Sequence, residues 1–166
     1  MTPAGHRRLI LTRHAKSSWD HPAMADFDRP LNTRGTRAAL ELGHWLHSRG
    51  YEPDEVLCSA ALRTRETWST AAAAPLEVPP KVKFLDNLYH AGPDVMLAVL
   101  RHATGDCVMM VGHNPGIGEF TQTKNEIHGA VMYTNADTRW LAGEVRGGDL
   151  YMSVFDGGTG ALWRGS

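Results

Sequence analysis

The sequence predicts an α/β fold, a three-layer sandwich in which a mostly parallel central sheet carries helices on both faces. The first observation is that short apolar runs alternate along the chain with longer segments of helical periodicity. That order favours right-handed strand–helix–strand units and parallel strands. The second is that these runs are apolar throughout, as in strands buried on both faces. A chain of 166 residues has the usual size of one domain, so a single domain is expected over residues 1–166.

Each apolar run and each periodic segment predicts one element. The helical spacing of Ala38, Leu42 and Trp45, followed by Gly50, predicts the first helix. Pro93 is typical of a helix start. Residues 20–32 are polar and turn-rich, which predicts a loop. The predicted strands are 8–13, 55–59, 81–85 and 107–111, and the predicted helices are 33–49, 61–74 and 93 to about 105.

Beyond residue 121 the pattern weakens. The stretch GEVRGGDLYMSVFDGGTGALW, residues 143–163, could hold one or two edge strands separated by glycine turns. The sequence leaves the organisation of residues 121–166 open.

Composition excludes several classes of protein. The net charge is −1, with 42% apolar and 21% charged residues, so no basic surface for nucleic acid or membrane is expected. Cys58 and Cys107 lie in apolar runs, which favours reduced core residues over a disulfide framework or a zinc site. The start, MTPAGHRR, lacks the apolar region of a signal peptide, and no apolar run approaches the ~20 residues of a membrane span. A cytoplasmic location is expected.

Conspicuous polar residues follow three of the predicted strands. Arg13 and His14 end the first, Ser59 ends the second with Arg63 soon after it, and His113 follows the strand at 107–111. In an open α/β sheet, ligands bind beyond the carboxyl ends of the strands, where helix N-termini add N–H donors. Forked guanidinium and imidazole donors, with no carboxylate neutralising them, are what a phosphoryl dianion requires.

Two other interpretations apply to histidines and arginines in such a sequence. An isolated histidine is usually a surface or satisfied core residue, which is how His44, His47, His102 and His128 are interpreted. A metal site is disfavoured because Arg13 and Arg63 would repel a cation and because HxxxH and CxxC spacings are absent from the sequence. We therefore expect no metal and no cofactor.

Three motifs taken together carry a family resemblance. LTRHAKSSW, SAALRTRETW and VGHNPG, in this order and spacing, resemble the histidine phosphatase superfamily, whose fold is phosphoglycerate-mutase-like. The short length, RPLNTRG and the GHNPG form resemble the SixA-like phosphohistidine phosphatase branch. The resemblance covers roughly residues 7–120.

The resemblance implies a role for each matching residue. His14 would be the nucleophile that becomes phosphorylated, Arg13 and Arg63 would bind the phosphoryl group, and His113 would stabilise its charge. Arg29, in DRPLN, matches a position that faces the phosphate pocket, although a solvated loop arginine is equally compatible with the sequence. The chemistry agrees, because phosphoryl transfer depends on positioning and charge stabilisation. The nucleophile must be a neutral imidazole, which neighbouring cations favour, and one of its nitrogens should donate to a backbone carbonyl.

The sequence departs from the family pattern in four places. Ala15 replaces a common glycine, and its methyl group should be tolerated. Asp20 stands where mutase-type members carry a phosphate-binding asparagine, so it is expected to point away from the phosphate. Asp86, with His90 behind it, is the nearest candidate for a general acid, but an ordinary loop role is favoured for both. Finally, a Pro-Thr-Gly region is not found in 121–166.

The predicted function is a metal-independent phosphatase with a phosphohistidine intermediate, acting on phosphohistidine in a protein. Such a leaving group needs no dedicated acid, whereas an alkoxide does. A small-molecule phosphomonoesterase is the alternative, which a working carboxylate at Asp86 would favour. A phosphate-binding pseudoenzyme is disfavoured because both histidines and both arginines are present, and a mutase because its extra substrate contacts are not found. The partners expected are a phosphorylated protein or small phosphorylated substrate, with no nucleic acid and no membrane; the oligomeric state is not predicted.

Overall fold

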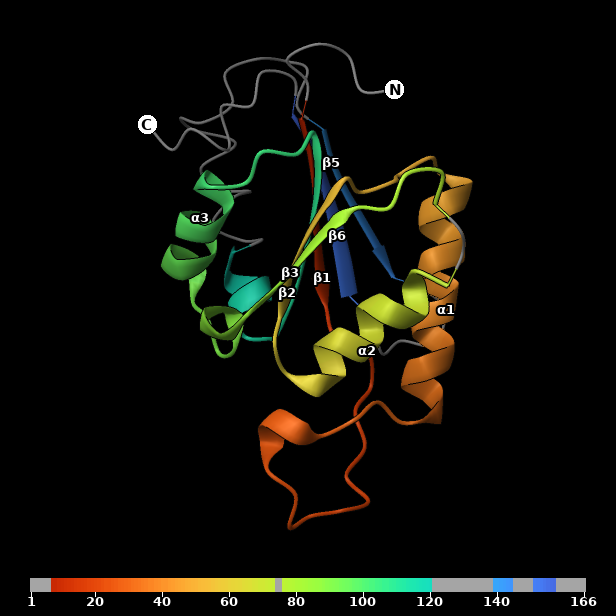
Figure 1. Ribbon diagram of the computed structural model, residues 1–166, viewed down its shortest axis with the longest axis vertical. Coiled ribbons are helices and arrows are strands. Elements are labelled where there is room, and N and C mark those ends of the chain that lie inside the picture. Colours follow the sequence, from red (N-terminus) through yellow and green to blue (C-terminus); the bar gives the residue numbers. More distant parts are fainter. Residues whose placement is uncertain (1–6, 74–75, 121–138, 145–150, 158–166) are drawn as a thin grey trace.

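The computed structural model describes residues 7–73, 76–120, 139–144 and 151–157, the last two ranges as backbone only. A central sheet lies between α1 (Thr33–Ser48) and α2 (Leu62–Ala71) on one face and α3 (Pro93–Arg101) on the other (Figure 1). The expected three-layer α/β fold is confirmed. Most of residues 121–166 lie outside the described residues. They include His128 and the positions where a Pro-Thr-Gly region was sought.

The described sheet has six strands in the order β3-β2-β4-β1-β6-β5. Their bounds are β1 Arg7–Arg13, β2 Glu55–Ser59, β3 Lys81–Leu85, β4 Cys107–Gly112, β5 Arg139–Glu144 and β6 Tyr151–Gly157. The first four are mutually parallel, as predicted. β6 pairs antiparallel with β1, and β5 with β6. The expectation of edge strands after residue 121 is therefore wrong for β6, because this strand pairs on both sides. Of these two strands, only β5 lies at an edge of the described sheet.

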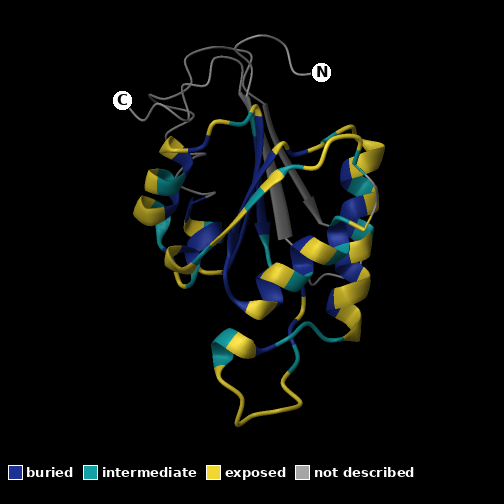
Figure 2. Cartoon of the chain, in the orientation of Figure 1, coloured by how far each residue is buried: buried dark blue, intermediate teal, exposed yellow. Residues whose placement is uncertain are grey.

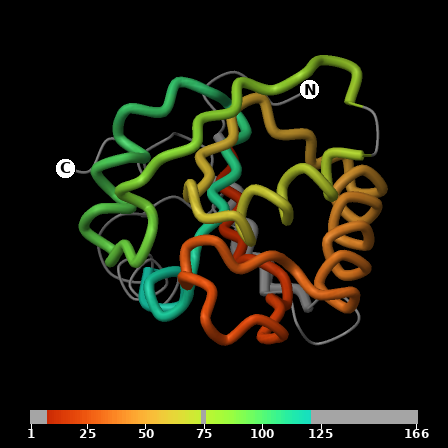
Figure 3. The backbone as a smooth tube through the Cα atoms, turned by 60° about the horizontal axis from the view of Figure 1, so that its bottom comes forward, coloured from red at the N-terminus to blue at the C-terminus, as the bar shows by residue number. Residues whose placement is uncertain are grey.

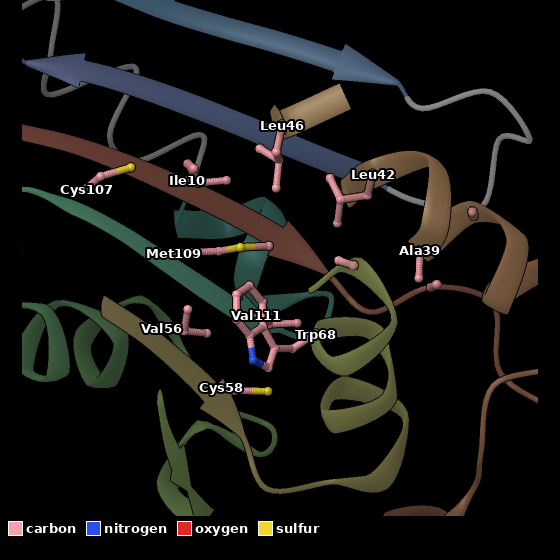
Figure 4. Close-up of a cluster of buried hydrophobic side chains, with 13 residues drawn as sticks. Ile10, Ala39, Leu42, Leu46, Val56, Cys58, Trp68, Cys107, Met109 and Val111 are labelled. Atoms are coloured by element: carbon pink, nitrogen blue, oxygen red, sulfur yellow. The ribbon is translucent and has the colours of Figure 1, made fainter. Parts of the chain in front are cut away.

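Alternation along the strands divides the apolar residues between two cores. Leu9 and Leu11 belong to the core that includes Met96 and Leu100 of α3. Ile10 points to the opposite face, where it joins a cluster with residues of α1 and α2 (Figure 4). β2 and β4 are buried along their whole length, whereas β3, at the edge, has only exposed and half-buried residues (Figure 2). Burial on both faces explains the continuous apolar runs of the central strands.

Two helices end earlier than the sequence predicted. α2 ends at Ala71 instead of 74, and α3 ends at Arg101 instead of near 105. Beyond α3, the N–H groups of Thr104 and Gly105 donate to a carboxylate oxygen of Glu55, at 2.8 and 2.9 Å. These amides are satisfied by a side chain of β2, so the chain turns there instead of continuing the helix.

Both cysteines are buried and free, as the sequence predicted. Burial raises the pKa of the Cys58 thiol to about 12, so the thiol is protonated at neutral pH. Within the described residues, no helix is both long and apolar enough to cross a membrane.

The two-sided core makes a testable prediction about α1. Leu42 is fully buried and Leu40, on the same helix, is 40% exposed. Leu42→Ala is expected to lower the free energy of unfolding by about 2–5 kcal/mol, because it leaves a cavity in the core. Leu40→Ala, the matched control with the same change in helix propensity, should cost about 1 kcal/mol or less. Urea unfolding measures both, and equal losses would contradict this assignment of the buried face.

Candidate active site

The carboxyl ends of three neighbouring parallel strands form the site. β4 lies between β1 and β2, with Arg13 in register with Gly112 and Cys58 with Val111. The backbone N–H of His14 donates to the carbonyl of Gly112 at 2.9 Å. His14 and His113 therefore leave adjacent strands at one edge, and their ring centroids lie 5.3 Å apart. Figure 3 brings this edge forward, with the segment after β1 in front of it.

His14 is held with one ring nitrogen available. Its Nδ1 lies 2.6 Å from the carbonyl oxygen of Ala15; since a carbonyl only accepts, Nδ1 carries the proton and Nε2 keeps its lone pair. The N–H of Ala15 donates to Thr67 Oγ1 at 3.0 Å, and that hydroxyl donates to the carbonyl of Arg63. α2 thus fixes the residue beside His14. The methyl group of Ala15 is fully buried in the core cluster.

The surroundings of His14 keep its imidazole neutral. Burial, which has the largest effect, and the charges of Arg63, Arg13 and Arg29 together lower its pKa to about 4, against the opposing hydrogen bond to Ala15. The structure therefore places all three predicted arginines close enough to act on this imidazole. At neutral pH, Nε2 is unprotonated and able to act as a nucleophile.

His113 is buried and has one nitrogen without a partner. Its Nε2 lies 2.8 Å from Ser59 Oγ, while Nδ1 is buried with no hydrogen-bond partner. Ser59 Oγ accepts from the N–H of Ala61 at 3.4 Å, which leaves its proton free to be donated to His113. In that arrangement Nδ1 carries the ring proton. Burial, with smaller contributions from His14, Arg63 and His90, lowers the pKa of His113 to about 3 against the opposing charge of Asp26, so the ring is uncharged at neutral pH and its Nδ1–H is a donor.

A carboxylate joins two of the arginines. Arg63 is 3% exposed, and its Nη1 and Nη2 donate to the backbone carbonyl and to Oδ2 of Asp26, at 2.6 and 2.9 Å. Arg29 donates to Oδ1 of Asp26 from Nε and Nη2, at 3.0 and 2.9 Å. The sequence-based view that no carboxylate neutralises these cations is therefore wrong. Two buried guanidiniums close together need a counter-charge, and the loop supplies one.

Arg29 is built into the loop instead of being solvated. It is 7% exposed, its Nη1 donates to Ser17 Oγ, and its guanidinium lies 3.7 Å from the ring centroid of Trp19. Its donors are engaged largely by Asp26 and Ser17. The structure thus brings Arg29 into the cluster mainly through Asp26, with its charge still acting on the pKa of His14.

The loop between β1 and α1 is closed by contacts between its two arms. The backbone N–H of Asn32 donates to the carbonyl of Lys16 at 2.9 Å, and Ser17 forms a β-bridge with Leu31. A Cβ on Gly35 would lie 2.1 Å from the carbonyl oxygen of Lys16, so only glycine permits this approach. This accounts for the glycine of RPLNTRG. The closed loop, with its short 3-10 helix Asp26–Asp28, lies below the strand ends (Figure 1).

A second loop, after β3, brings aromatic rings to the cluster. Tyr89 donates to Oδ2 of Asp26 at 2.6 Å, and its ring lies 5.4 Å from that of His113. His90 Nε2 lies 3.9 Å from the same Oδ2. A Cβ on Gly116 would lie 2.0 Å from the carbonyl oxygen of Ala91. Gly116, the second glycine of GHNPG, therefore lets the turn after His113 pack directly against this loop.

Two predicted acidic positions lie away from the cluster. Asp20 is exposed, in line with the expectation that it points away. Asp86 is exposed at the start of the short 3-10 helix Asp86–Leu88. Its backbone carbonyl accepts from the N–H of Tyr89 at 3.1 Å, but no described hydrogen bond or ion pair joins its carboxylate to the site. Sequence reasoning missed Asp26 and Tyr89. The signal for Asp26 was weak, because the loop holds three aspartates and only the fold selects one.

The arrangement is suited to a compact anion with several oxygen atoms. Arg63 Nε and His113 Nδ1 are both buried without a hydrogen-bond partner, and buried donors of this kind are normally satisfied. They lie beside the neutral imidazole of His14. Among the described residues, no three histidine, cysteine or acidic side chains are grouped so as to hold a metal ion.

Comparison with known proteins adds sequence evidence. The sequence profile of the histidine phosphatase superfamily (branch 1) matches residues 9–88. An uncharacterized chloroplastic protein of Arabidopsis thaliana is 38% identical over 120 residues, which cover 66% of this chain and 55% of that protein. This chain spans between 55% and 65% of the length of the first curated relatives that it matches.

Solved structures give the same picture. A candidate SixA phosphohistidine phosphatase from Nakamurella multipartitia superposes with a TM-score of 0.67 at 31% identity, over 98% of this chain and 92% of that one. The protein histidine phosphatase SixA complexed with tungstate superposes with a TM-score of 0.62 at 25% identity, over 69% of this chain and 74% of that one.

The two neutral histidines predict how stability depends on pH. Unfolded histidine has a pKa of about 6.5, whereas the folded pKa values are about 4 for His14 and about 3 for His113. Between pH 6.5 and 5 the unfolded chain therefore binds protons that the folded chain does not. The free energy of unfolding should fall as the pH falls, by up to about 1.4 kcal/mol per pH unit for each histidine.

Urea unfolding at pH 7 and pH 5 measures this dependence. His113→Asn should lose its share of the pH dependence. His44→Asn, the same change at an exposed position of α1, should keep the full effect. Equal wild-type stability at both pH values would contradict the neutral, buried state of the two rings.

Proposed function

This chain belongs to the histidine phosphatase superfamily, and we propose that it is a metal-independent phosphatase acting on phosphohistidine in a protein through a phosphohistidine intermediate on His14. The observation that carries the proposal is the grouping of one unprotonated nitrogen with two unpartnered donors, since His113 and Arg63 both act on His14 at close range. Nε2 of His14 is unprotonated, and two buried donors, Arg63 Nε and His113 Nδ1, have no partner of their own. A phosphoryl group bound there would satisfy both donors.

The reaction proceeds in two displacements. His14 Nε2 attacks phosphorus, and the bond to the leaving atom breaks as the new P–N bond forms. Water then attacks the phosphorylated imidazole and releases inorganic phosphate, which restores His14. Arg13, Arg63 and His113 stabilise the charge on the equatorial oxygens in both steps.

Arg29 acts in this proposal through Asp26 instead of as a main phosphate ligand. Its donors hold Oδ1 of Asp26, whose Oδ2 binds Arg63. Asp26 thereby fixes both Nη groups of Arg63, Nη1 through its backbone carbonyl and Nη2 through Oδ2, and leaves Nε for the substrate. A bidentate contact of this kind restricts the guanidinium to one orientation.

The choice of phosphohistidine rests on the leaving group and on similarity. The hydrogen bond from Tyr89, with those from Arg29 and Arg63, holds the pKa of Asp26 well below its usual range, so this carboxylate is ionised and has no proton to give. Asp86 is exposed and outside the cluster, so a carboxylate acid for ester substrates is not supported. The similar SixA protein has been solved with tungstate, an oxyanion of phosphate shape. A cytoplasmic location and the absence of nucleic acid partners remain predictions.

The direct test is turnover of a phosphohistidine-bearing protein domain by wild type and His14→Ala in buffer containing EDTA. Wild type should release phosphate, and His14→Ala should be slower by a factor on the order of 10⁴–10⁶, since the nucleophile is removed. His21→Ala, an exposed histidine in the neighbouring loop, is the matched control and should retain activity.

Three outcomes would contradict the proposal. Near-normal turnover by His14→Ala would show that His14 is not the nucleophile. Activity lost in EDTA and restored by a divalent metal would overturn the metal-independent reaction. A phosphoserine peptide turned over faster than phosphohistidine would instead favour the phosphomonoesterase alternative.

A further inference from the structure

His90 is the most exposed titratable side chain that contacts the cluster. Its side chain is 63% exposed, against 42% for Asp26 and 4% for Arg63. Its ring lies 4.0 Å from the ring of Tyr89 and 6.1 Å from that of His113, measured between centroids. Its Nε2 faces Oδ2 of Asp26 at 3.9 Å. The imidazole thus stands at the open side of the site, next to both a carboxylate and the second histidine.

The backbone of His90 is held in an uncommon conformation. Its φ of 57° is the one positive value for a non-glycine residue within the described part of the chain. Left-handed backbone costs energy for residues other than glycine, and it is enriched at functional positions. The contact of Gly116 with the carbonyl of Ala91 fixes the next peptide against the turn that carries His113. The fold therefore aims this imidazole at the cluster instead of leaving it on a relaxed loop.

The other titratable groups of the cluster are committed to other tasks. Asp26 is ionised and accepts from Tyr89, Arg29 and Arg63. The Tyr89 hydroxyl donates its proton to Asp26, and burial and that bond raise its pKa. His113 is buried with Nε2 on Ser59 and Nδ1 toward the phosphoryl position. His90 alone in this set combines exposure, a titratable nitrogen and a nearby counter-charge.

A substrate carried on a protein must leave the site toward solvent. His14 follows the end of β1, and in-line attack by its Nε2 sends the leaving group away from the ring. Among the rings that contact His113, that of His90 is the exposed one. Imidazole is the side chain best suited to exchange protons near neutral pH. The facing charged and titratable groups are Asp26 from the first loop, Arg63 from α2, whose guanidinium lies 5.9 Å from the ring of Tyr89, and His113 after β4.

Building on the proposed function, we propose that His90 is the general acid that protonates the leaving group, with Asp26 stabilising its imidazolium form. In the first step, His14 Nε2 bonds to phosphorus, the bond from phosphorus to the leaving nitrogen or oxygen breaks, and that atom takes the proton of His90. In the second step, water attacks the phosphohistidine and gives a proton to the now neutral His90. Phosphate departs and both histidines return to their starting states. This role also extends the range of substrates to phosphate esters.

The test compares leaving groups of different basicity. Aryl and alkyl phosphates are assayed as kcat/KM, which reports the steps up to phosphorylation of His14. His90→Asn, in which asparagine also tolerates positive φ, should lose about 10²–10⁴-fold on phenyl and alkyl phosphates. It should lose far less on p-nitrophenyl phosphate, whose leaving group needs no proton. Added imidazole should restore activity to His90→Gly.

Asp86→Asn, the corresponding change at an exposed acidic position of the same loop, is the control and should behave as wild type. A loss in His90→Asn that is equal for all leaving groups would overturn the acid role, as would no loss at all. If the leaving-group effect appears in Asp86→Asn instead, the Asp86 carboxylate is the general acid and the inference about His90 is overturned. A wild-type protein that turns over neither these esters nor phosphohistidine would overturn the proposed function. Normal turnover by the wild type together with an unaffected His90→Asn would overturn this inference alone.

Discussion

The Asp26 carboxylate is the interaction on which the rest of the site depends. Arg29 and Arg63 are both buried, at 7% and 3% exposure, and two buried cations are costly without a counter-charge. Asp26 binds both, and Tyr89 donates to it as well. One side chain therefore joins the loop before α1, the first turn of α2 and the loop after β3. These segments are far apart in sequence, and the shared carboxylate sets how they meet around His14.

Burial and positive charge then set the protonation states. Imidazole near three guanidiniums loses its proton more readily, and removal from water acts in the same direction. Nε2 of His14 is consequently unprotonated at neutral pH without an adjacent base, which supports the proposed role of His14 as the nucleophile. The hydrogen bond to Ala15 fixes which nitrogen attacks, and the contact with Ser59 fixes the donor nitrogen of His113. The two histidines thus differ in which nitrogen is available, a free Nε2 on His14 and a donating Nδ1 on His113, because their hydrogen-bond partners differ.

The sequence predicted the parallel sheet and the convergence of Arg13, His14, Arg63 and His113 because both follow from local signals. Strand ends meet at one edge in any parallel sheet, and β2 and β3 match their predicted bounds. Features that depend on distant partners were not predictable. α3 ends early because a carboxylate of β2 binds the following amides, and β6 inserts beside β1 although its own segment has a weak pattern. Asp26 was hidden among similar loop residues, since only the fold brings it to the arginines.

The central claim is that the phosphoryl group is carried by Nε2 of His14. Rapid acid-free quenching of wild type during turnover, followed by peptide mapping and ³¹P NMR, locates the phosphorylated atom. The account predicts a phosphoryl group on Nε2 of His14, because Nδ1 donates to the carbonyl of Ala15. A phosphoryl group on Nδ1, on His113 or on His90, or turnover with no phosphorylated histidine, would contradict it.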